Sequence, residues 1–173
     1  MHKSDDLLII HSLRELNFRE LMDVYVQTNR KSGRDNYPFL SEPQQMLMAE
    51  QDVYTYLKEC FFNQPDAYYL IWAPTDRYKA ALRLETYRDG YLITALETVP
   101  EGRRMGYASN LLNQVKVFLS TKNAAKIYAH IHKKNIASMS LHISCGFSKI
   151  LDYAILLDGS VLRSYDTYCF VLC

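Results

Sequence analysis

The spacing of hydrophobic positions changes several times along the chain, and each change marks a different predicted element. Short runs rich in β-branched and aromatic residues predict strands. These runs lie at 6–13, 67–72 and 125–132. Hydrophobic residues recur every three or four positions between 108 and 119, which predicts an amphipathic helix with one buried face. A further helix is predicted within 135–147, where Asn135 is suited to cap its start and Gly146 to end it.

Two helices are predicted in the first third of the chain, with a polar loop between them. Asn17 and Glu20 form an N-terminal capping pattern, and hydrophobic residues follow at helical spacing. Ser41 and Gln44 form a second capping pattern at the start of a longer helix. The residues between these helices, 28–40, are mostly polar and predict a loop.

Two Asp-Gly pairs indicate tight hairpins. Asp89-Gly90 lies between two strand-like runs within 78–98, and Asp158-Gly159 lies between two more within 148–172. The predicted order is strand, two helices, three strands, helix, strand, helix and two strands. This order predicts an α/β fold, with one mixed, mostly antiparallel sheet of about seven strands flanked by four helices.

Composition and charge narrow the classes of protein that fit. With 173 residues, 49% of them hydrophobic and 23% charged, the chain is long enough for a sizeable core. We expect a single domain over 1–173, because no linker or repeat interrupts the sequence. The net charge of +1, from 20 basic and 19 acidic residues, argues against nucleic-acid or anionic-membrane partners. The apolar run 7–10 is too short for a signal peptide or a membrane span, so a soluble, cytoplasmic protein is expected.

Cysteine and histidine positions do not predict a metal site. His130 and His132 are two apart in a predicted strand and face the same side, but no further ligand follows at a recognisable spacing. The cysteines form no C-x-x-C pair, so buried or free thiols are expected in place of a disulfide framework or a zinc site. They are Cys60, Cys145, Cys169 and Cys173.

The stretch VPEGRRMGYASNLL, residues 99–112, combines a strand end, two glycines and two arginines at the start of a predicted helix. A helix N-terminus presents free N–H groups and a positive dipole end, and a glycine lets an anion approach them closely. Arg103 and Arg104 add positive charge for phosphate oxygens. The pattern Arg103-x-x-Gly106-x-Ala108 therefore suits a pyrophosphate. The same pattern also suits a turn with no ligand, and it matches neither the nucleotide P-loop nor the G-x-G-x-x-G fingerprint.

A second motif gives this stretch a context. In the first, a strand ends near a proline and [Arg/Gln]-x-x-Gly-x-[Gly/Ala] opens a helix, as LETVPEGRRMGYASNLL does here. In the second, a helix carries six characteristic positions, of which five fit. The six positions are Asn135, Ser138, Leu141, His142, Gly146 and Phe147, and His142 is the one that departs from the pattern. With both motifs, one helix and one strand apart, the chain resembles the GNAT superfamily of acyl-CoA-dependent N-acetyltransferases, specifically over 79–147 and more loosely in its whole element order.

The resemblance implies a splayed pair of parallel strands that receives the pantetheine arm of acetyl-CoA, without a metal. The arm would bond the backbone near 97–99, the pyrophosphate would lie on the N–H groups of 104–109, and Asn135 would touch the pantetheine. The residues expected to bind acetyl-CoA are Thr98, Val99, Arg103, Arg104, Met105, Gly106, Tyr107, Ala108, Ser109, Asn135 and Ser138. The reaction would be direct attack of an amine on the thioester, with no acyl-enzyme.

Two residues are candidates for proton transfer in that reaction. His142 occupies the position where the family usually has a tyrosine that protonates the leaving thiolate, and a histidine can donate a proton near neutral pH. The alternative is a packed or solvated histidine, with water as the acid. Glu97, at a strand end, is the candidate general base, and Glu85 is a weaker one. The alternative for Glu97 is an ordinary solvated carboxylate.

The sequence does not identify the amine that accepts the acetyl group. In the family it lies between the loop after the first helix and the last strands, here 28–41 and about 158–164. Neither segment forms an acidic funnel for a polycation. A small-molecule amine is therefore the first expectation and a protein amine the second. A different class, an acyl-CoA-binding sensor or interaction module with little catalysis, stays open because His142 replaces the usual tyrosine. The sequence is compatible with a homodimer.

Overall fold

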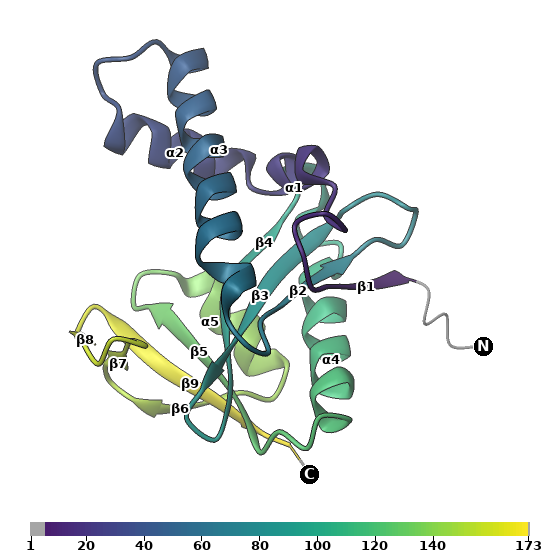
Figure 1. Ribbon diagram of the computed structural model, residues 1–173. Coiled ribbons are helices and arrows are strands. Elements are labelled where there is room, and N and C mark those ends of the chain that lie inside the picture. The colour runs from purple at the N-terminus through teal and green to yellow at the C-terminus, as the bar shows by residue number, and fades with distance from the viewer. Residues whose placement is uncertain (1–5, 173) are drawn as a thin grey trace.

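Seven strands form one mixed sheet in the computed structural model, which describes residues 6–172 (Figure 1). Their order across the sheet is β1-β2-β3-β4-β5-β9-β6. Strands β4 and β5 are parallel, whereas the other neighbours pair antiparallel. The strands are β1 (Leu7–Ile10), β2 (Tyr68–Trp72), β3 (Ala80–Tyr87), β4 (Gly90–Thr98), β5 (Lys126–His132), β6 (Ser148–Leu151) and β9 (Tyr165–Val171). The expected α/β fold with one mixed sheet and a parallel pair is confirmed.

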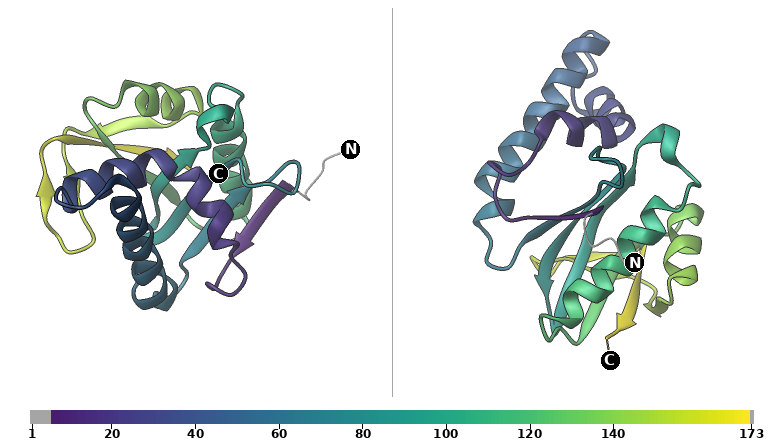
Figure 2. Two further views of the ribbon diagram at one scale, coloured as in Figure 1. Left: turned by 90° about the horizontal axis from the view of Figure 1, so that it is seen from above. Right: turned by 90° about the vertical axis from the view of Figure 1, so that its right-hand side faces the viewer.

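Helices cover both faces of this sheet (Figure 2). They are α1 (Phe18–Val24), α2 (Val26–Asn36), α3 (Glu42–Glu59), α4 (Tyr107–Ser120) and α5 (Ile136–Ser144), with short 3₁₀ turns at Phe61–Asn63 and Pro100–Gly102. In β2, Tyr69 and Ile71 pack toward α1 and α3, while Leu70 packs toward α4. Because both faces are covered, β2 is a continuous apolar run without polar alternation. None of the helices between residues 6 and 172 combines the length and the apolar character that crossing a bilayer requires.

The described chain has five α-helices, so the expectation of four was wrong. The extra helix is α2, where a loop was expected over 28–40. Most of its side chains are polar, and its buried residues are Asn29 and Gly33. A Cβ at Gly33 would lie 2.5 Å from the backbone carbonyl oxygen of Gln45 in α3, so the two helices approach backbone to backbone at this glycine. This helix packs through a glycine and an amide, and therefore shows no apolar stripe in the sequence.

The C-terminal segment also differs from the expected pair of strands around Asp158-Gly159. Four strands form there, and only the two-residue strands β7 (Ala154–Ile155) and β8 (Val161–Leu162) flank that turn. They make a separate hairpin, while β6 and β9 pair in the main sheet. The Tyr87 hydroxyl donates to the Ile155 carbonyl oxygen at 2.8 Å, which fixes the hairpin on the face of the sheet that carries α1 to α3.

Strands β4 and β5 diverge after a short paired stretch. They pair only from Gly90↔Lys126 to Ile93↔Ala129, although both strands continue further. A β-bulge in β4 lies where the two strands diverge. It is shown by the φ of 51° at Ala95 and by the shift of the register against β3. The Tyr25 hydroxyl donates to the Ala95 carbonyl oxygen at 2.6 Å. The bulge is thus held from the α1 side, and a gap opens between the two strands.

The described cysteines are free thiols, as expected: Cys60 is exposed, and Cys145 and Cys169 are buried. Cys173 lies outside the described residues.

Candidate active site

Two adjoining hollows surround the divergence of β4 and β5. The first, which we call the splay cavity, has a volume of about 390 Å³ and lies between the two strands, α5 and the β7–β8 hairpin. Its lining residues are Leu92, Ile93, Thr94, Ala95, Leu96, Ala129, His130, Ile131, His132, Asn135, Ser138, His142, Leu156, Leu162 and Tyr165. The second, the α4–α5 groove, has a volume of about 1090 Å³ and runs between 102–109 and α5. Both hollows are lined by Leu96, Asn135 and Ser138, so they adjoin at these residues.

The N-terminus of α4 forms one wall of the groove. Gly106, just before the helix, has a φ of 80°, and a Cβ there would meet nothing within 4 Å. No side chain of the described residues caps the first turn, so its N–H groups are free at the groove. Arg103 and Arg104 are exposed beside it. This wall can hold an anion, and every expected residue from 103 to 109 except Met105 lines it.

The end of β4 offers fewer free backbone groups than the resemblance implied. The Val99 N–H donates to the Lys79 carbonyl oxygen at 3.0 Å, and the Val99 carbonyl accepts from the Gly102 N–H at 2.9 Å. Val99 is also buried and does not line the groove, whereas Thr98 does. Because N–H groups alternate in direction along a strand, those of Leu96 and Thr98 face away from β3 toward the gap.

Helix α5 brings three polar residues to the splay cavity along one stripe: Asn135, Ser138 and His142. Asn135 is the N-cap, because its Oδ1 accepts from the Ser138 N–H at 3.1 Å. Its amide nitrogen has no hydrogen bond to any residue between 6 and 172. The stripe expected from the sequence spacing therefore exists and faces the hollows.

His142 is buried at 2% exposure, and its ring packs edge-on against Phe147. Its Nδ1 lies 2.8 Å from the Ser138 carbonyl oxygen, so Nδ1 carries a proton and donates. The Nε2 atom is enclosed and has no partner among the described residues. Burial lowers the pKa of His142, with the Ser138 hydrogen bond opposing it. At neutral pH the ring is uncharged, and its Nε2 lone pair is free.

The two candidate carboxylates lie outside the splay cavity. The Glu97 carboxylate accepts from the Thr28 hydroxyl of α2 at 2.6 Å, on the α1–α3 side of β4, and residue 97 borders the groove only. Glu85 is buried at 4% exposure and accepts from the Thr94 hydroxyl at 2.9 Å. Glu85 is therefore engaged within the sheet, and Glu97 is the more accessible of the two.

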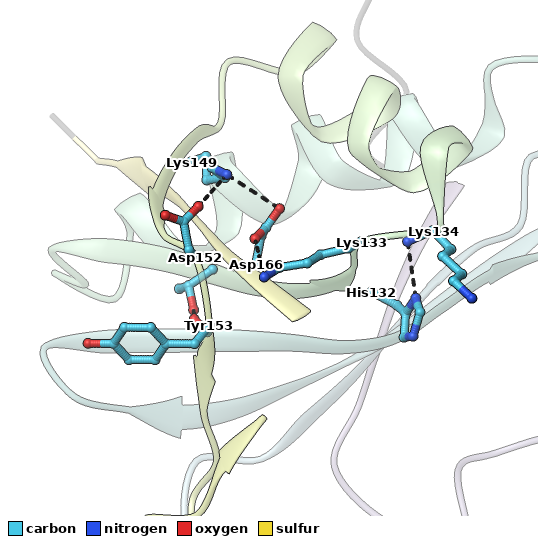
Figure 3. Close-up of polar contacts among 8 residues, drawn as sticks. His132, Lys133, Lys134, Lys149, Asp152, Tyr153 and Asp166 are labelled. Atoms are coloured by element: carbon cyan, nitrogen blue, oxygen red, sulfur yellow. Dashed lines mark hydrogen bonds and ion pairs between the residues drawn. The ribbon is translucent and has the colours of Figure 1, made fainter. Parts of the chain in front are cut away.

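His130 and His132 line the splay cavity from β5, opposite His142. Burial and the charge of Arg88 lower the pKa of His130, whose Nε2 is enclosed without a partner among the described residues. The His132 Nδ1 accepts from the Lys134 N–H at 3.1 Å (Figure 3). No group of three or more His, Cys, Asp or Glu side chains within 6–172 could hold a metal ion. The sequence placed both histidines on one side of a strand, but the cavity also depends on where the β7–β8 hairpin packs, which the sequence pattern did not give.

A charged cluster fixes the turn that leads from β5 into α5 (Figure 3). Asp166 on β9 has an 8% exposed side chain, with the Lys133 Nζ 3.7 Å and the Lys149 Nζ 3.6 Å from its two oxygens. The Lys149 ammonium also donates to exposed Asp152 at 2.6 Å. Since Lys133 follows His132 and precedes Asn135, this cluster positions the turn between two cavity residues without lining the cavity itself.

Comparison with known proteins agrees with this architecture. The model of the acetyltransferase (GNAT) family matches residues 12–147. The PaiA N-acetyltransferase of Thermoplasma acidophilum, solved with coenzyme A, is similar, with a TM-score of 0.64 and 16% identity over 95% of this chain and 98% of that one. An acetyltransferase of Streptococcus agalactiae is similar with a TM-score of 0.62 and 16% identity, over 97% of this chain and 99% of that one. The ribosomal-protein-S18-alanine N-acetyltransferase of Escherichia coli is similar with a TM-score of 0.57 and 15% identity, over 96% of this chain and 94% of that one. No curated protein matches the chain in sequence.

Proposed function

Since the chain belongs to the GNAT family of acetyltransferases, we propose that it transfers an acetyl group from acetyl-CoA directly to a primary amine of a small molecule. One observation carries this proposal: an anion-binding groove at the start of α4 adjoins a cavity between diverging strands, and both are lined by Asn135 and Ser138. A groove followed by a smaller cavity suits a long phosphate-bearing donor whose reactive end meets a small acceptor.

The groove fits coenzyme A by its own chemistry. Free N–H groups in the first turn of α4 and the nearby side chains of Arg103 and Arg104 suit the pyrophosphate. Gly106 leaves the approach open, because no side chain lies between its backbone and the groove. Acetyl-CoA, when bound, would supply the acetyl thioester, and coenzyme A would leave as the thiol. Between the pyrophosphate site and the splay cavity, we assign the pantetheine arm to Thr98 and the Asn135 amide, since the Val99 backbone is already bonded.

His142 is the proposed residue at the sulfur. It lies seven residues after Asn135 on the same stripe, farther into the splay cavity. Because its neutral ring holds the proton at Nδ1, it must first gain a proton at Nε2 before it can give one to the thiolate. The role of general acid therefore requires the imidazolium form.

Glu97 is the proposed carboxylate of the acceptor side. It lies just after the bulge of β4, where Thr28 orients it. A carboxylate at this place attracts the ammonium form of an amine. Its further role as the base stays a prediction, and it requires a water between the carboxylate and the reacting amine, because Glu97 does not line the splay cavity.

The size of the splay cavity supports a small-molecule acceptor over a protein amine. The β7–β8 hairpin bounds the cavity with Leu156 and Leu162. A protein N-terminus is the second candidate, since one structural neighbour is the ribosomal-protein-S18-alanine N-acetyltransferase of Escherichia coli.

The test has two measurements on the full chain. Acetyl-CoA and CoA are titrated by calorimetry and thermal unfolding, and thiol release from acetyl-CoA is followed over a panel of amines and N-terminal peptides. Binding together with amine-dependent thiol release supports the enzyme. Binding without turnover across the panel identifies the alternative, an acyl-CoA-binding module. Absence of any CoA-dependent stabilisation overturns both.

A further inference from the structure

The splay cavity is largely apolar and contains no permanently charged group from residues 6–172. Aliphatic side chains from β4, β5 and the hairpin make up most of its lining, and neither a carboxylate, an ammonium nor a guanidinium group lines it. A second charge on a bound molecule would lose its hydration there without gaining a partner, which is strongly unfavourable. The lining thus favours an acceptor with one amine on an apolar body.

Three imidazoles line the splay cavity, those of His130, His132 and His142. His142 comes from α5, on the side where the α4–α5 groove adjoins the splay cavity. His130 and His132 come from β5 and alternate with Ala129 and Ile131, which pack into the core under α4. They therefore face the other side of the sheet, where the Tyr87 hydroxyl holds the hairpin. An acceptor that enters beside the hairpin meets these two rings first.

The two rings differ in their ability to take a proton. The Nδ1 of His132 already accepts the Lys134 N–H, so its neutral form carries the proton on Nε2 and has no free lone pair. No hydrogen bond joins either ring nitrogen of His130 to another described residue. Its surroundings are the edge of Tyr87, the charge of Arg88, Tyr128 and His132 on its own strand, and Thr167, its partner in the β5–β9 register. None of these neighbours supplies a negative charge that would keep the ring protonated.

On the basis of the proposed function, we infer that the acceptor is a primary amine with an apolar, otherwise uncharged body, and that His130 accepts its proton inside the splay cavity. One proton passes from the ammonium to Nδ1 of His130, because Nε2 is enclosed and Nδ1 is neither enclosed nor hydrogen-bonded to a described residue. The amine nitrogen then bonds to the acetyl carbon while the carbon–sulfur bond breaks with its electron pair on sulfur. The second proton lost by nitrogen ends on that sulfur as a thiol, and His130 returns its proton to water. Glu97 then attracts the ammonium from outside the cavity.

The substrate part is tested with two amines of equal length. Hexylamine has one charge and an apolar tail, whereas hexamethylenediamine ends in a second ammonium. We expect kcat/KM for the diamine to be lower by about tenfold or more. Equal or better turnover of the diamine overturns the apolar acceptor site. Because CoA binding is measured separately, failure of this comparison is distinguishable from failure of the proposed function.

The proton acceptor is tested with His130→Gln, and with His132→Gln as the matched control on the same strand and face. With hexylamine, kcat/KM of the unaltered protein should rise between about pH 5 and 7 as an imidazole loses its proton. His130→Gln should lower kcat by about 100-fold and abolish this rise, with CoA affinity retained. His132→Gln should keep the rise. A rise that persists in His130→Gln overturns the assignment.

A readout independent of turnover is the ring itself. In NMR titrations of the five histidines, the signal that disappears in His130→Gln belongs to His130. Its pKa should lie below the ordinary histidine pKa of 6.5. With CoA bound, hexylamine should shift that signal. A His130 signal that hexylamine leaves unchanged, while turnover proceeds, rules out His130 as the acceptor of the proton.

Discussion

The Nδ1 of His142 lies 2.8 Å from the carbonyl oxygen of Ser138, one helical turn earlier in α5. A carbonyl oxygen can only accept, so this contact assigns the proton of the neutral ring to Nδ1 and leaves Nε2 bare. The helix therefore sets the protonation state of a residue that lines the cavity. Two predictions about His142 follow, one on its chemistry and one on stability.

On the chemistry, ¹⁵N NMR should show His142 as the Nδ1–H tautomer at neutral pH. If the ring protonates the thiolate, His142→Gln should lower kcat by about 100-fold while the affinity for CoA stays unchanged. His142→Ala with unaltered kcat would show that water protonates the sulfur. An Nε2–H tautomer would contradict the helix-based assignment.

On stability, the free energy of unfolding should fall as the pH is lowered through 6.5. Burial lowers the pKa of folded His142 below the ordinary 6.5, so the unfolded chain binds the proton first. The loss begins near 6.5, grows toward the folded pKa and is constant below it. Urea unfolding from pH 8 to 5 measures the slope, and His142→Gln should reduce it. His130, whose pKa is also lowered, contributes a slope of the same sign, so the double variant should be flatter still.

Gly106 and Gly159 form a matched pair for testing the groove. Their φ angles are 80° and 83°, and a Cβ at either would meet nothing within 4 Å. Alanine at either position should therefore lower the free energy of unfolding by a similar amount, about 1–2 kcal/mol, through backbone strain alone. Only Gly106→Ala should also weaken CoA binding in calorimetry, by about tenfold, because its methyl group stands at the start of α4. Equal CoA affinities for the two variants would place the pyrophosphate elsewhere.

The order of elements was predictable because most of them bury an apolar face with a regular period. The α4 stripe from Ala108 to Leu119 is such a case, whereas β2 was predictable from its short, continuous run of apolar and aromatic residues. The turn of the C-terminal hairpin was predicted from Asp158-Gly159, but the short strands beside it were not, because strands of two residues carry too few positions for a period. Its attachment through Tyr87 to the Ile155 carbonyl is a tertiary contact that no local pattern encodes.

Gly33 explains the other missed element and can be tested directly. In an isolated helix, Gly33→Ala would stabilise α2 by about 1 kcal/mol. Here the new Cβ would lie 2.5 Å from the backbone oxygen of Gln45, so α2 and α3 must separate. We expect a net loss of about 1–3 kcal/mol in chemical unfolding. Arg34→Ala, at the exposed next position, should change stability by about 0.5 kcal/mol or less. A Gly33→Ala protein more stable than the parent would contradict this packing.

The candidate site was predictable where it depends on local chemistry. The Gly106 turn and the Asn135 cap are both readable from a few neighbouring residues, and both line the groove. The acceptor side was not, because its lining joins β5 to a hairpin and to Tyr165 across the sheet. The alternation of His130 and His132 with buried residues was the available signal, yet it gave a shared side without saying what that side faces.

Loss of the Asp166 charge should lower the free energy of unfolding more than loss of the Asp152 charge, because Asp166 holds the turn between β5 and α5. Asp152 is the control. Both approach the Lys149 ammonium, but the Asp166 side chain is 8% exposed and that of Asp152 is 79% exposed. Asp166→Asn leaves Lys133 and Lys149 without their buried counter-charge, and should cost about 1–3 kcal/mol in unfolding free energy. Asp152→Asn breaks the shorter contact, yet water replaces it, so about 0–1 kcal/mol is expected. Urea unfolding of both variants at pH 7 makes the comparison, and an Asp152 effect equal to that of Asp166 would show that burial does not decide the strength of this cluster.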